Sequence, residues 1–503
     1  MLYTEDTYEI DEYPYFGYMR GAYTKYELKD LDKYAISLGI ELIPCIQTLG
    51  HLKMALRWPF ADAIKDRPDI LLCDEPEAYK FIEGMLKTCR ECFSTNKIHI
   101  GMDEAHDVGL GKYMDKHGFQ NRFDILSRHL EKVKEMADKY GFEPMMWSDM
   151  FFRLTSETGD YYDMNAVVSE DVRRKIPNVT QVYWDYYHED INTYRTLLEK
   201  HIELGQNVVF AGGIWTWQGM GINYAKTLRT TVPALKACRE ADISDVFATM
   251  WGDDGGEVNV YSALLGMQLF SECANNEDVS EEQLRERFFE CTGYDMESFK
   301  ALEIDDYPSE WCHASEALTI SKQALCQDIL LGLFDKNFEG IDLKGHYKSK
   351  LENLKNIEAP AGLEALFNYH RQLLMVLIQK CDMGLRITEA YKKFDVPKIT
   401  VLISELETLY KDIEILHQKF RILWLSTNKP FGLDRADLRF GGLLARVKAA
   451  IERLTDFSVG KIEKIEELEV PRLMFGGDDV KAGKSLVNCQ AYNAIAIPAS
   501  DGV

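Results

Sequence analysis

Two adjacent carboxylates, Asp103 and Glu104, follow directly on a short apolar run that ends in glycine. The run, residues 98–101, has the length and composition of a buried strand. Adjacent side chains of a regular strand point to opposite faces, but at a strand end relaxed by glycine both can turn into one cavity. Two carboxylates in one pocket push their pKa values apart, which gives one proton donor and one anion. An Asp-Glu dipeptide is most often part of a solvated loop, so the preceding strand is what makes this pair a candidate for acid–base chemistry.

Tryptophan follows four other expected strands. These residues are Trp147, Trp184, the pair Trp215 and Trp217, and Trp251. Indoles stack on the C–H faces of a sugar ring, and carboxylates accept hydrogen bonds from its hydroxyls. Carboxylates close to these tryptophans in the sequence are Asp149, Asp185, Asp253, Asp254 and Glu257. Any one tryptophan could be core filling, but the set together favours a sugar-binding pocket.

A further candidate, His51, comes after Gly50 just past an expected strand at 40–44. From there its imidazole could orient a carboxylate of the pair. A single histidine in a loop is more often structural or exposed, and that alternative stays open.

Short apolar runs alternate with longer amphipathic ones from the start to about residue 290. The strand-like runs lie at 1–3, 40–44, 97–101, 144–147, 180–184, 208–211 and 245–250, and helical segments at 24–38, 78–93, 123–140, 191–204 and around 228–239. This alternation predicts an α/β fold, a (β/α)8 TIM barrel whose first strand is missing and would precede Met1. The strand ends of a barrel meet at one mouth, whereas an open sheet concentrates its ligand residues at one switch point. Polar and aromatic residues follow nearly every strand, so we favour the barrel.

Beyond residue 300 the sequence changes character. Long amphipathic stretches at 364–394, 399–424 and 438–454 predict a mostly α-helical C-terminal domain, with a turn at 428–432. A coiled coil for dimerisation is the competing interpretation, but the apolar positions are too broad for a heptad seam. We therefore expect a catalytic barrel at 1–295, a helical domain at 296–470 and a weakly packed tail at 471–503, with a homodimer left open.

The overall composition excludes several classes of protein. The 503 residues carry a formal net charge of -24, which disfavours nucleic acid and anionic membranes as partners. No run approaches the roughly 20 apolar residues of a membrane span. Eleven scattered cysteines include one C-x-x-C pair, at 89–92, with no second pair or nearby histidines to complete a zinc site. We read them as reduced thiols of a cytoplasmic protein, with a signal peptide ahead of Met1 as the alternative.

These motifs resemble glycoside hydrolase family 20. Residues 98–104 resemble the family signature, a strand ending His-x-Gly-x-Asp-Glu, and residues 43–51 are similar to its Ile-Pro-Glu-x-Asp-x-Pro-Gly-His hallmark. Trp147, Trp184 and the Trp251-Gly252-Asp253 motif follow in the family's order. The resemblance covers residues 1 to about 260, and the helical remainder is similar to the C-terminal domain of a bacterial, intracellular branch. The N-terminal α/β domain usual in that branch is absent, so the chain looks N-terminally truncated.

The resemblance implies an exo-acting, retaining β-N-acetylhexosaminidase that removes terminal β-linked GlcNAc or GalNAc. Glu104 would be the general acid and base, while the substrate's own acetamide oxygen attacks and forms an oxazolinium ion. Asp103 would hold the acetamide N–H, His51 would support the pair, and the tryptophans, Trp215 and Trp217 included, would wall the sugar. Asp253 would bind a distal hydroxyl. The resemblance implies no metal or other cofactor, and its partner would be a saccharide.

The chain departs from the family pattern in several places. Gln47 replaces an aspartate and Cys45 a glutamate of the second hallmark. The tyrosine expected to hold the acetamide oxygen is not on its usual strand, so either Tyr186 or Tyr187 takes its place or another kind of residue replaces it. A sugar-binding arginine of the first strand would lie before Met1, and Arg20 lies too far into a loop to be assigned its place. A non-catalytic carbohydrate-binding or inactive fragment is therefore the alternative function.

Overall fold

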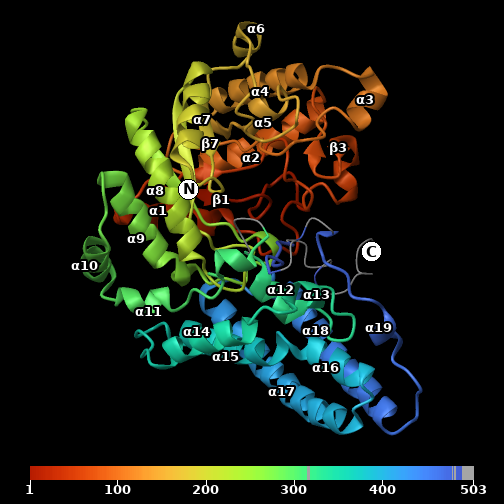
Figure 1. Ribbon diagram of the computed structural model, residues 1–503. Helices are drawn as coiled ribbons and strands as arrows, with labels where there is room; N and C mark the ends of the chain where they lie inside the picture. Colours follow the sequence, from red (N-terminus) through yellow and green to blue (C-terminus); the bar gives the residue numbers. More distant parts are fainter. Residues whose placement is uncertain (314–317, 478–479, 481–482, 490–494, 496–503) are drawn as a thin grey trace. The chain divides into compact units, whose positions relative to one another are not determined.

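The computed structural model describes residues 1–503 except 314–317, 478–479, 481–482, 490–494 and 496–503 (Figure 1). The chain forms two compact units. The first unit comprises residues 1–212 and 230–247, and the second unit comprises residues 213–229 and 248–503. Each has its own apolar core.

The described residues contain a seven-stranded sheet in the order β1-β2-β5-β6-β7-β8-β9. Its strands are β1 (Leu2–Tyr3), β2 (Pro44–Cys45), β5 (Lys97–His99), β6 (Glu143–Trp147), β7 (Thr180–Trp184), β8 (Val208–Gly213) and β9 (Val246–Thr249). Neighbouring strands from β1 to β8 pair in parallel. Seven strands joined by helices confirm the prediction of a (β/α) barrel fold with one strand fewer than eight, and β1 and β9 are the two edges of this sheet.

Helices of the first unit match the amphipathic stretches of the sequence. They are α1 (Lys25–Ser37), α2 (Pro76–Cys92), α4 (Arg122–Lys139) and α7 (Ile191–Glu203), with α8 (Tyr224–Glu240) continuing from the second unit. Local signals fix their starts: Thr24 and Glu27 form a reciprocal capping box, and Asn121 and Asp190 cap α4 and α7. Helix α1 packs on α2, and α2 packs on α4.

The second expected strand is shifted. Residues 40–43 are outside any strand, and β2 begins only at Pro44. Ile40 is 54% exposed, so its apolar character does not mark a core position here. The shift carries the end of β2 toward Gln47, the residue that contacts the predicted site.

The second unit is mostly helical, as predicted. Its longer helices are α9 (Leu264–Asn275), α10 (Glu281–Thr292), α14 (Leu343–Lys355), α15 (Glu364–Lys380), α16 (Met383–Lys392), α17 (Val396–Thr427) and α18 (Leu433–Ser458). Helix α17 packs along both α15 and α18, and its buried leucines recur at helical spacing. The predicted stretch 364–394 is broken at 381–382, and the predicted turn at 428–432 joins α17 to α18.

Part of the predicted tail is packed. Ser485 and Leu486 are buried, and the backbone N–H of Leu486 donates to the carbonyl of Trp311. Hydrogen bonds from these residues fix the segment in the second unit, while the last eight residues of the predicted tail lie outside the described residues. No helix in the described part of the chain is long and apolar enough to cross a membrane.

Candidate active site

The Asp103-Glu104 pair lies in a tight turn directly after β5. Gly101 and Met102 have φ of 72° and 76°, and Glu104 has φ of 51°, all in the left-handed region. Non-glycine residues adopt this region at a cost, and such strain persists only where surrounding contacts impose it. The reversal turns both carboxylates to the same side, where both contact His51. His99, buried in β5, accepts a hydrogen bond from the Gly101 N–H at its Nδ1, which anchors the turn.

Asp103 is held between an amide and an imidazole. Gln47 Nε2 donates to its Oδ1 at 2.9 Å, and His51 Nε2 lies 3.1 Å from its Oδ2. Burial acts to raise the pKa of Asp103, but the His51 charge and these hydrogen bonds outweigh it and hold that pKa below the usual value. Asp103 is therefore an anion, the state suited to accepting an N–H or stabilising a cation.

Glu104 shares the same imidazole but is more open to solvent. Its Oε2 lies 3.3 Å from His51 Nε2, and its side chain is 34% exposed, against 12% for Asp103. Burial raises and His51 lowers the pKa of Glu104, with a net shift downward. The charge of Asp103 raises the pKa of His51 to about 12 even though burial acts to lower it. The cluster of His51, Asp103 and Glu104 is thus one cation between two anions.

Asp149 has a different role from the one predicted from the sequence. It was expected to accept sugar hydroxyls, but it is fully buried and both its oxygens are engaged. Oδ2 accepts from the Glu104 backbone N–H at 3.0 Å, and Oδ1 accepts from Trp184 Nε1 at 3.2 Å. Burial first and the Asp103 charge second raise the pKa of Asp149 to about 7. Asp149 therefore positions Glu104 and an indole.

Tyr161 is a site residue that the strand pattern missed. Its hydroxyl hydrogen-bonds the Glu104 side chain and the Nε2 of His106, the latter at 3.2 Å. Its ring meets Trp184 edge-on at 5.4 Å. Tyr161 lies in a loop without periodicity, between β6 and β7, so only its residue type could have drawn attention to it.

Trp147 and Trp184 end β6 and β7, as predicted, and both are more than nine-tenths buried. Trp147 packs against His99 with ring centroids 4.3 Å apart. Trp184 stacks on Tyr186 at 5.5 Å and meets Tyr187 edge-on at 6.4 Å. The two tyrosines weighed for the acetamide oxygen therefore lie against a predicted sugar-binding indole.

Carboxylates that follow β1 also approach this cluster. Glu5 accepts from the Tyr3 hydroxyl at 3.4 Å, and His51 is among the charges that act on its pKa, which burial raises. Arg20 Nε donates to Asp6 at 2.7 Å and its Nη2 lies 3.9 Å from Glu5. The loop that seemed to carry Arg20 away from the strand instead returns it to the end of β1.

Four predicted site residues belong to the second unit. Trp215 and Trp217 stack on each other with centroids 4.1 Å apart, and both are buried. The Thr216 hydroxyl between them donates to the carbonyl of Trp251 at 2.8 Å. Asp253 follows Trp251 and is exposed. Thr216 thus joins the segment after β8 to the segment after β9.

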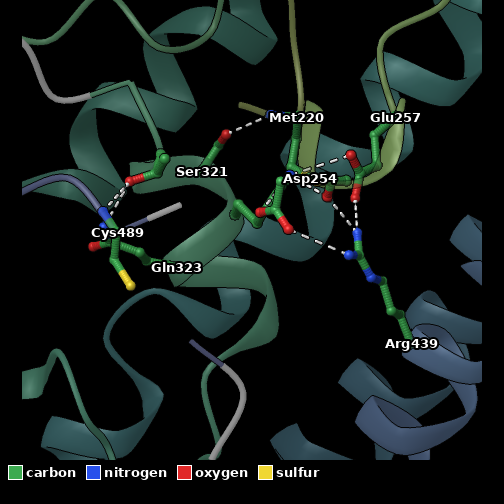
Figure 2. Close-up of polar contacts among 9 residues, drawn as sticks. Met220, Asp254, Glu257, Ser321, Gln323, Arg439 and Cys489 are labelled. Carbon is green, nitrogen blue, oxygen red and sulfur yellow. Dashed lines mark hydrogen bonds and ion pairs between the residues drawn. The ribbon is translucent and has the colours of Figure 1, made fainter. Parts of the chain in front are cut away.

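Three further carboxylates were expected to bind sugar hydroxyls and are instead committed within the protein. Asp185 accepts from the Tyr183 hydroxyl at 2.7 Å and lies 2.6 Å from His188 Nδ1. Asp254 and Glu257 form ion pairs with Lys322 and with Arg439, the latter shown in Figure 2. Sequence proximity to a tryptophan did not distinguish a binding carboxylate from a structural one. Among the described residues, no group of three or more His, Cys, Asp or Glu side chains is placed to hold a metal ion.

Two family models match separate parts of the chain. The glycosyl hydrolase family 20 catalytic domain matches residues 4–170, which contain the His51, Asp103 and Glu104 cluster, and the glycoside hydrolase 20C C-terminal domain matches residues 297–488. The chain belongs to glycoside hydrolase family 20. The family's catalytic model thus covers the turn after β5, and its C-terminal model covers the helical region.

Individual relatives are distant. Hexosaminidase D of Bos taurus is 23% identical over 233 residues, 43% of this chain and 64% of that protein. A beta-hexosaminidase of Akkermansia muciniphila is 33% identical over 98 residues, 17% of this chain and 20% of that protein. The chain therefore spans less than two thirds of the length of these curated relatives. A beta-N-acetylhexosaminidase structure from Bacteroides fragilis aligns at 17% identity and a TM-score of 0.41, over 58% of this chain and 65% of that one.

Proposed function

We propose that this family 20 protein is an exo-acting, retaining β-N-acetylhexosaminidase that uses its substrate's acetamide as the nucleophile. The carrying observation is the turn after β5, where a buried, ionised Asp103 and a more exposed Glu104 share His51. An anion next to a proton donor is what acetamide participation requires, because the oxazolinium is cationic and the leaving oxygen needs a proton.

The reaction divides between the two carboxylates. Asp103 accepts the acetamide N–H and orients the carbonyl oxygen toward the anomeric carbon. As that oxygen bonds to the carbon, the glycosidic C–O bond breaks and Glu104 gives its proton to the departing oxygen. Glu104 then takes a proton from water, which attacks the anomeric carbon and reopens the oxazolinium ring. The sugar leaves with its original configuration.

Glu104 must be protonated to start this sequence, although His51 lowers its pKa in the free site. A neutral sugar that fills the site excludes water from Glu104, and desolvation favours the protonated acid. The lowered pKa also favours the alternative function, a carbohydrate-binding protein without turnover, in which Glu104 only accepts hydroxyl hydrogen bonds.

Hydrolysis of a chromogenic β-GlcNAc glycoside separates these functions. Glu104→Gln should abolish release at unchanged melting temperature, and a thiazoline analogue of the oxazolinium should bind far more tightly than the product sugar. Glu135→Gln, an exposed change on α4, is the matched control and should leave the rate unchanged. Sugar binding without release would support the binding protein, and full activity of Glu104→Gln would remove this residue from proton transfer.

We propose that the molecule recognised is a saccharide with a terminal N-acetylhexosamine. We also propose that the protein is located in the cytoplasm. In the first unit Cys45, Cys73, Cys89 and Cys92 are buried free thiols, which fits a reducing compartment. Thiol titration of the denatured, unreduced protein from its native cell tests this, since reactive thiols missing from the count would indicate oxidation.

A further inference from the structure

Aromatic side chains form a contiguous cluster in the segments that follow β1 and β2. Tyr15 and Tyr18 come from the segment after β1, and Trp58 from the segment after β2. The centroid of the Trp58 ring lies 5.5 Å from that of Tyr15 and 5.4 Å from that of Tyr18, and the two tyrosine centroids are 5.6 Å apart. We call these three side chains the aromatic platform.

The platform stands on the core of the first unit but remains open at its surface. Tyr13 packs between Phe81, which is fully buried in α2, and Phe60, which lies 6.5 Å from Tyr15. Aromatic contacts therefore run from the core to the surface. Tyr15 and Tyr18 are still 47% and 43% exposed. Single exposed apolar side chains need no explanation, whereas a cluster of them commonly marks an interaction site.

The platform rings hold one another in place. Tyr18 meets both Tyr15 and Trp58 edge-on, with interplanar angles of 74° and 71°, which is a favoured arrangement of aromatic pairs. Arg57 covers Trp58, and its Cζ lies 5.4 Å from the ring centroid. Side chains fixed in this way lose little conformational entropy when a ligand binds, so the platform is preorganised.

Polar groups of the platform are available to a ligand. Within the described part of the chain, the hydroxyls of Tyr15 and Tyr18 make no hydrogen bond, and the Arg57 guanidinium forms no ion pair. A purely apolar partner would desolvate these groups without replacing their bonds to water, at a cost. Aromatic rings beside open hydroxyl and guanidinium groups suit a ligand with C–H faces and hydroxyl edges, which describes a sugar ring.

The small apolar area also favours a sugar over a second copy of this chain. Charged residues that flank the two segments in the sequence are exposed and already paired, Asp11 with Lys25 and Asp62 with Lys65. A stable protein–protein interface buries about 800 Å² on each partner, around an apolar centre. Three rings bordered by paired charges provide much less apolar surface than such a centre needs.

Both segments are connected directly to the proposed catalytic cluster. His51 precedes Trp58 by seven residues, which span at most about 25 Å. Arg20 follows Tyr18 by two residues, and its Nε donates to Asp6, close after β1, at 2.7 Å. The carboxyl ends of parallel strands lie on one side of a sheet, so these segments and the turn after β5 begin on the same side.

We propose that the aromatic platform binds a sugar on the leaving-group side of the substrate, beyond the scissile bond. This placement rests on the proposed function, in which Glu104 gives its proton to the leaving oxygen, whereas the contacts and exposure of the rings do not. Stacking on the platform favours oligosaccharides over glycosides with a short leaving group, because only the longer chain reaches the rings.

Hydrolysis of β-linked N-acetylglucosamine oligomers of increasing length tests the proposal, with kcat/KM for each oligomer divided by kcat/KM for the chromogenic glycoside. For the parent we expect this ratio to rise with length and then to level off. Tyr18→Ala and Trp58→Ala should lower the final ratio by about tenfold, a usual loss when an aromatic anchor is removed, and Trp58→Phe should lower it less. Tyr34→Ala, at a 65% exposed position on α1, is the control and should keep the parent's ratio. Melting temperatures check that each variant is folded.

Three results would overturn the platform as a sugar site. They are a ratio that does not change with length in the parent, an unchanged final ratio in folded Tyr18→Ala and Trp58→Ala proteins, and a dimer that Trp58→Ala dissociates in sedimentation experiments. Failure of the proposed function looks different, because no glycoside of any length would be cleaved. Calorimetric titration of the parent and of Tyr18→Ala with the longest oligomer would then decide: tighter binding by the parent supports the platform, and equal or absent binding overturns it.

Discussion

Asp149 and Glu104 are joined by a hydrogen bond in which the backbone N–H of Glu104 donates to Asp149 Oδ2 at 3.0 Å. The other Asp149 oxygen accepts from the indole of Trp184. Glu104 has the unfavourable φ of 51°, so an outside contact must hold it there. One buried carboxylate thus fixes both the proposed proton donor and a proposed wall of the sugar pocket.

Removing this carboxylate should impair turnover more than binding. For Asp149→Leu we expect kcat to fall by about 10- to 100-fold with KM changed much less, the range seen when supporting contacts of a catalytic group are lost. Asp149→Asn keeps one acceptor oxygen and should lose less. Steady-state kinetics with the aryl glycoside measure both, and Asp138→Asn, on the exposed face of α4, is the control. An unchanged kcat in a folded Asp149→Leu protein would refute the positioning role.

Two features require glycine at position 101, its positive φ and the close approach of the Gln47 side chain. A Cβ there would lie 2.1 Å from Gln47 Oε1, and Gln47 cannot move without leaving Asp103 and the Met102 N–H. Gly141 has the same φ of 72° but no atom within 4 Å of an added Cβ. Both alanine variants should pay the left-handed cost of about 1–2 kcal/mol. Gly101→Ala should lose about 1–3 kcal/mol more through overpacking, together with activity.

Denaturant unfolding compares the two glycine variants directly. Equal free energies of unfolding would show that Gln47 yields to the added methyl group. Retained activity in Gly101→Ala would show that the Gln47 contact with Asp103 is not needed.

The sequence predicted the regular elements, and it predicted candidate residues that directly follow a strand. Strand and helix periodicity predicted the sheet and the long helices. The glycine before Asp103 and Glu104 indicated that both carboxylates can turn to one side, and the place of His51 just past a strand made it a candidate to orient one of them. The sequence could not predict partners supplied across the fold. The roles of Asp149 and Tyr161 depend on which atoms approach Glu104 after folding, and the ion pairs of Asp254 depend on helices more than 60 residues away. The presence of an aspartate or glutamate in the sequence does not indicate whether its carboxylate will contact water, a sugar or an arginine.

Lys322 should contribute far more to the free energy of unfolding than a surface lysine in a similar ion pair. It is fully buried between Asp254 and Glu257, whereas Lys336 pairs with Glu339 at 45% side-chain exposure. Lys322→Met should cost about 3–5 kcal/mol, because it leaves buried negative charge undercompensated. Lys336→Met should cost no more than about 1 kcal/mol. Thermal and denaturant unfolding measure the difference, and comparable losses would mean that Arg439 alone neutralises both carboxylates.

His51 sets the protonation of both proposed catalytic carboxylates, and its removal should move the pH profile as a whole. The cation lowers the pKa of Asp103 and of Glu104, since it favours their ionised forms. In the free enzyme the acid limb of kcat/KM reports the carboxylate that must be ionised, Asp103, and the alkaline limb reports the one that must be protonated, Glu104.

His51→Gln removes the charge but keeps a hydrogen-bond donor, so both pKa values should rise and both limbs should move to higher pH. We expect an alkaline-limb shift of about one pH unit or more, the lower end of the effect of a charge at this distance. The measurement is kcat/KM for the aryl glycoside across the pH range in which the protein stays folded. His117→Gln, at an exposed position on the surface of the first unit, should leave both limbs in place. A shift to lower pH, or an unmoved alkaline limb with a lower maximum, would mean that His51 acts on the substrate and not through the charge of Glu104.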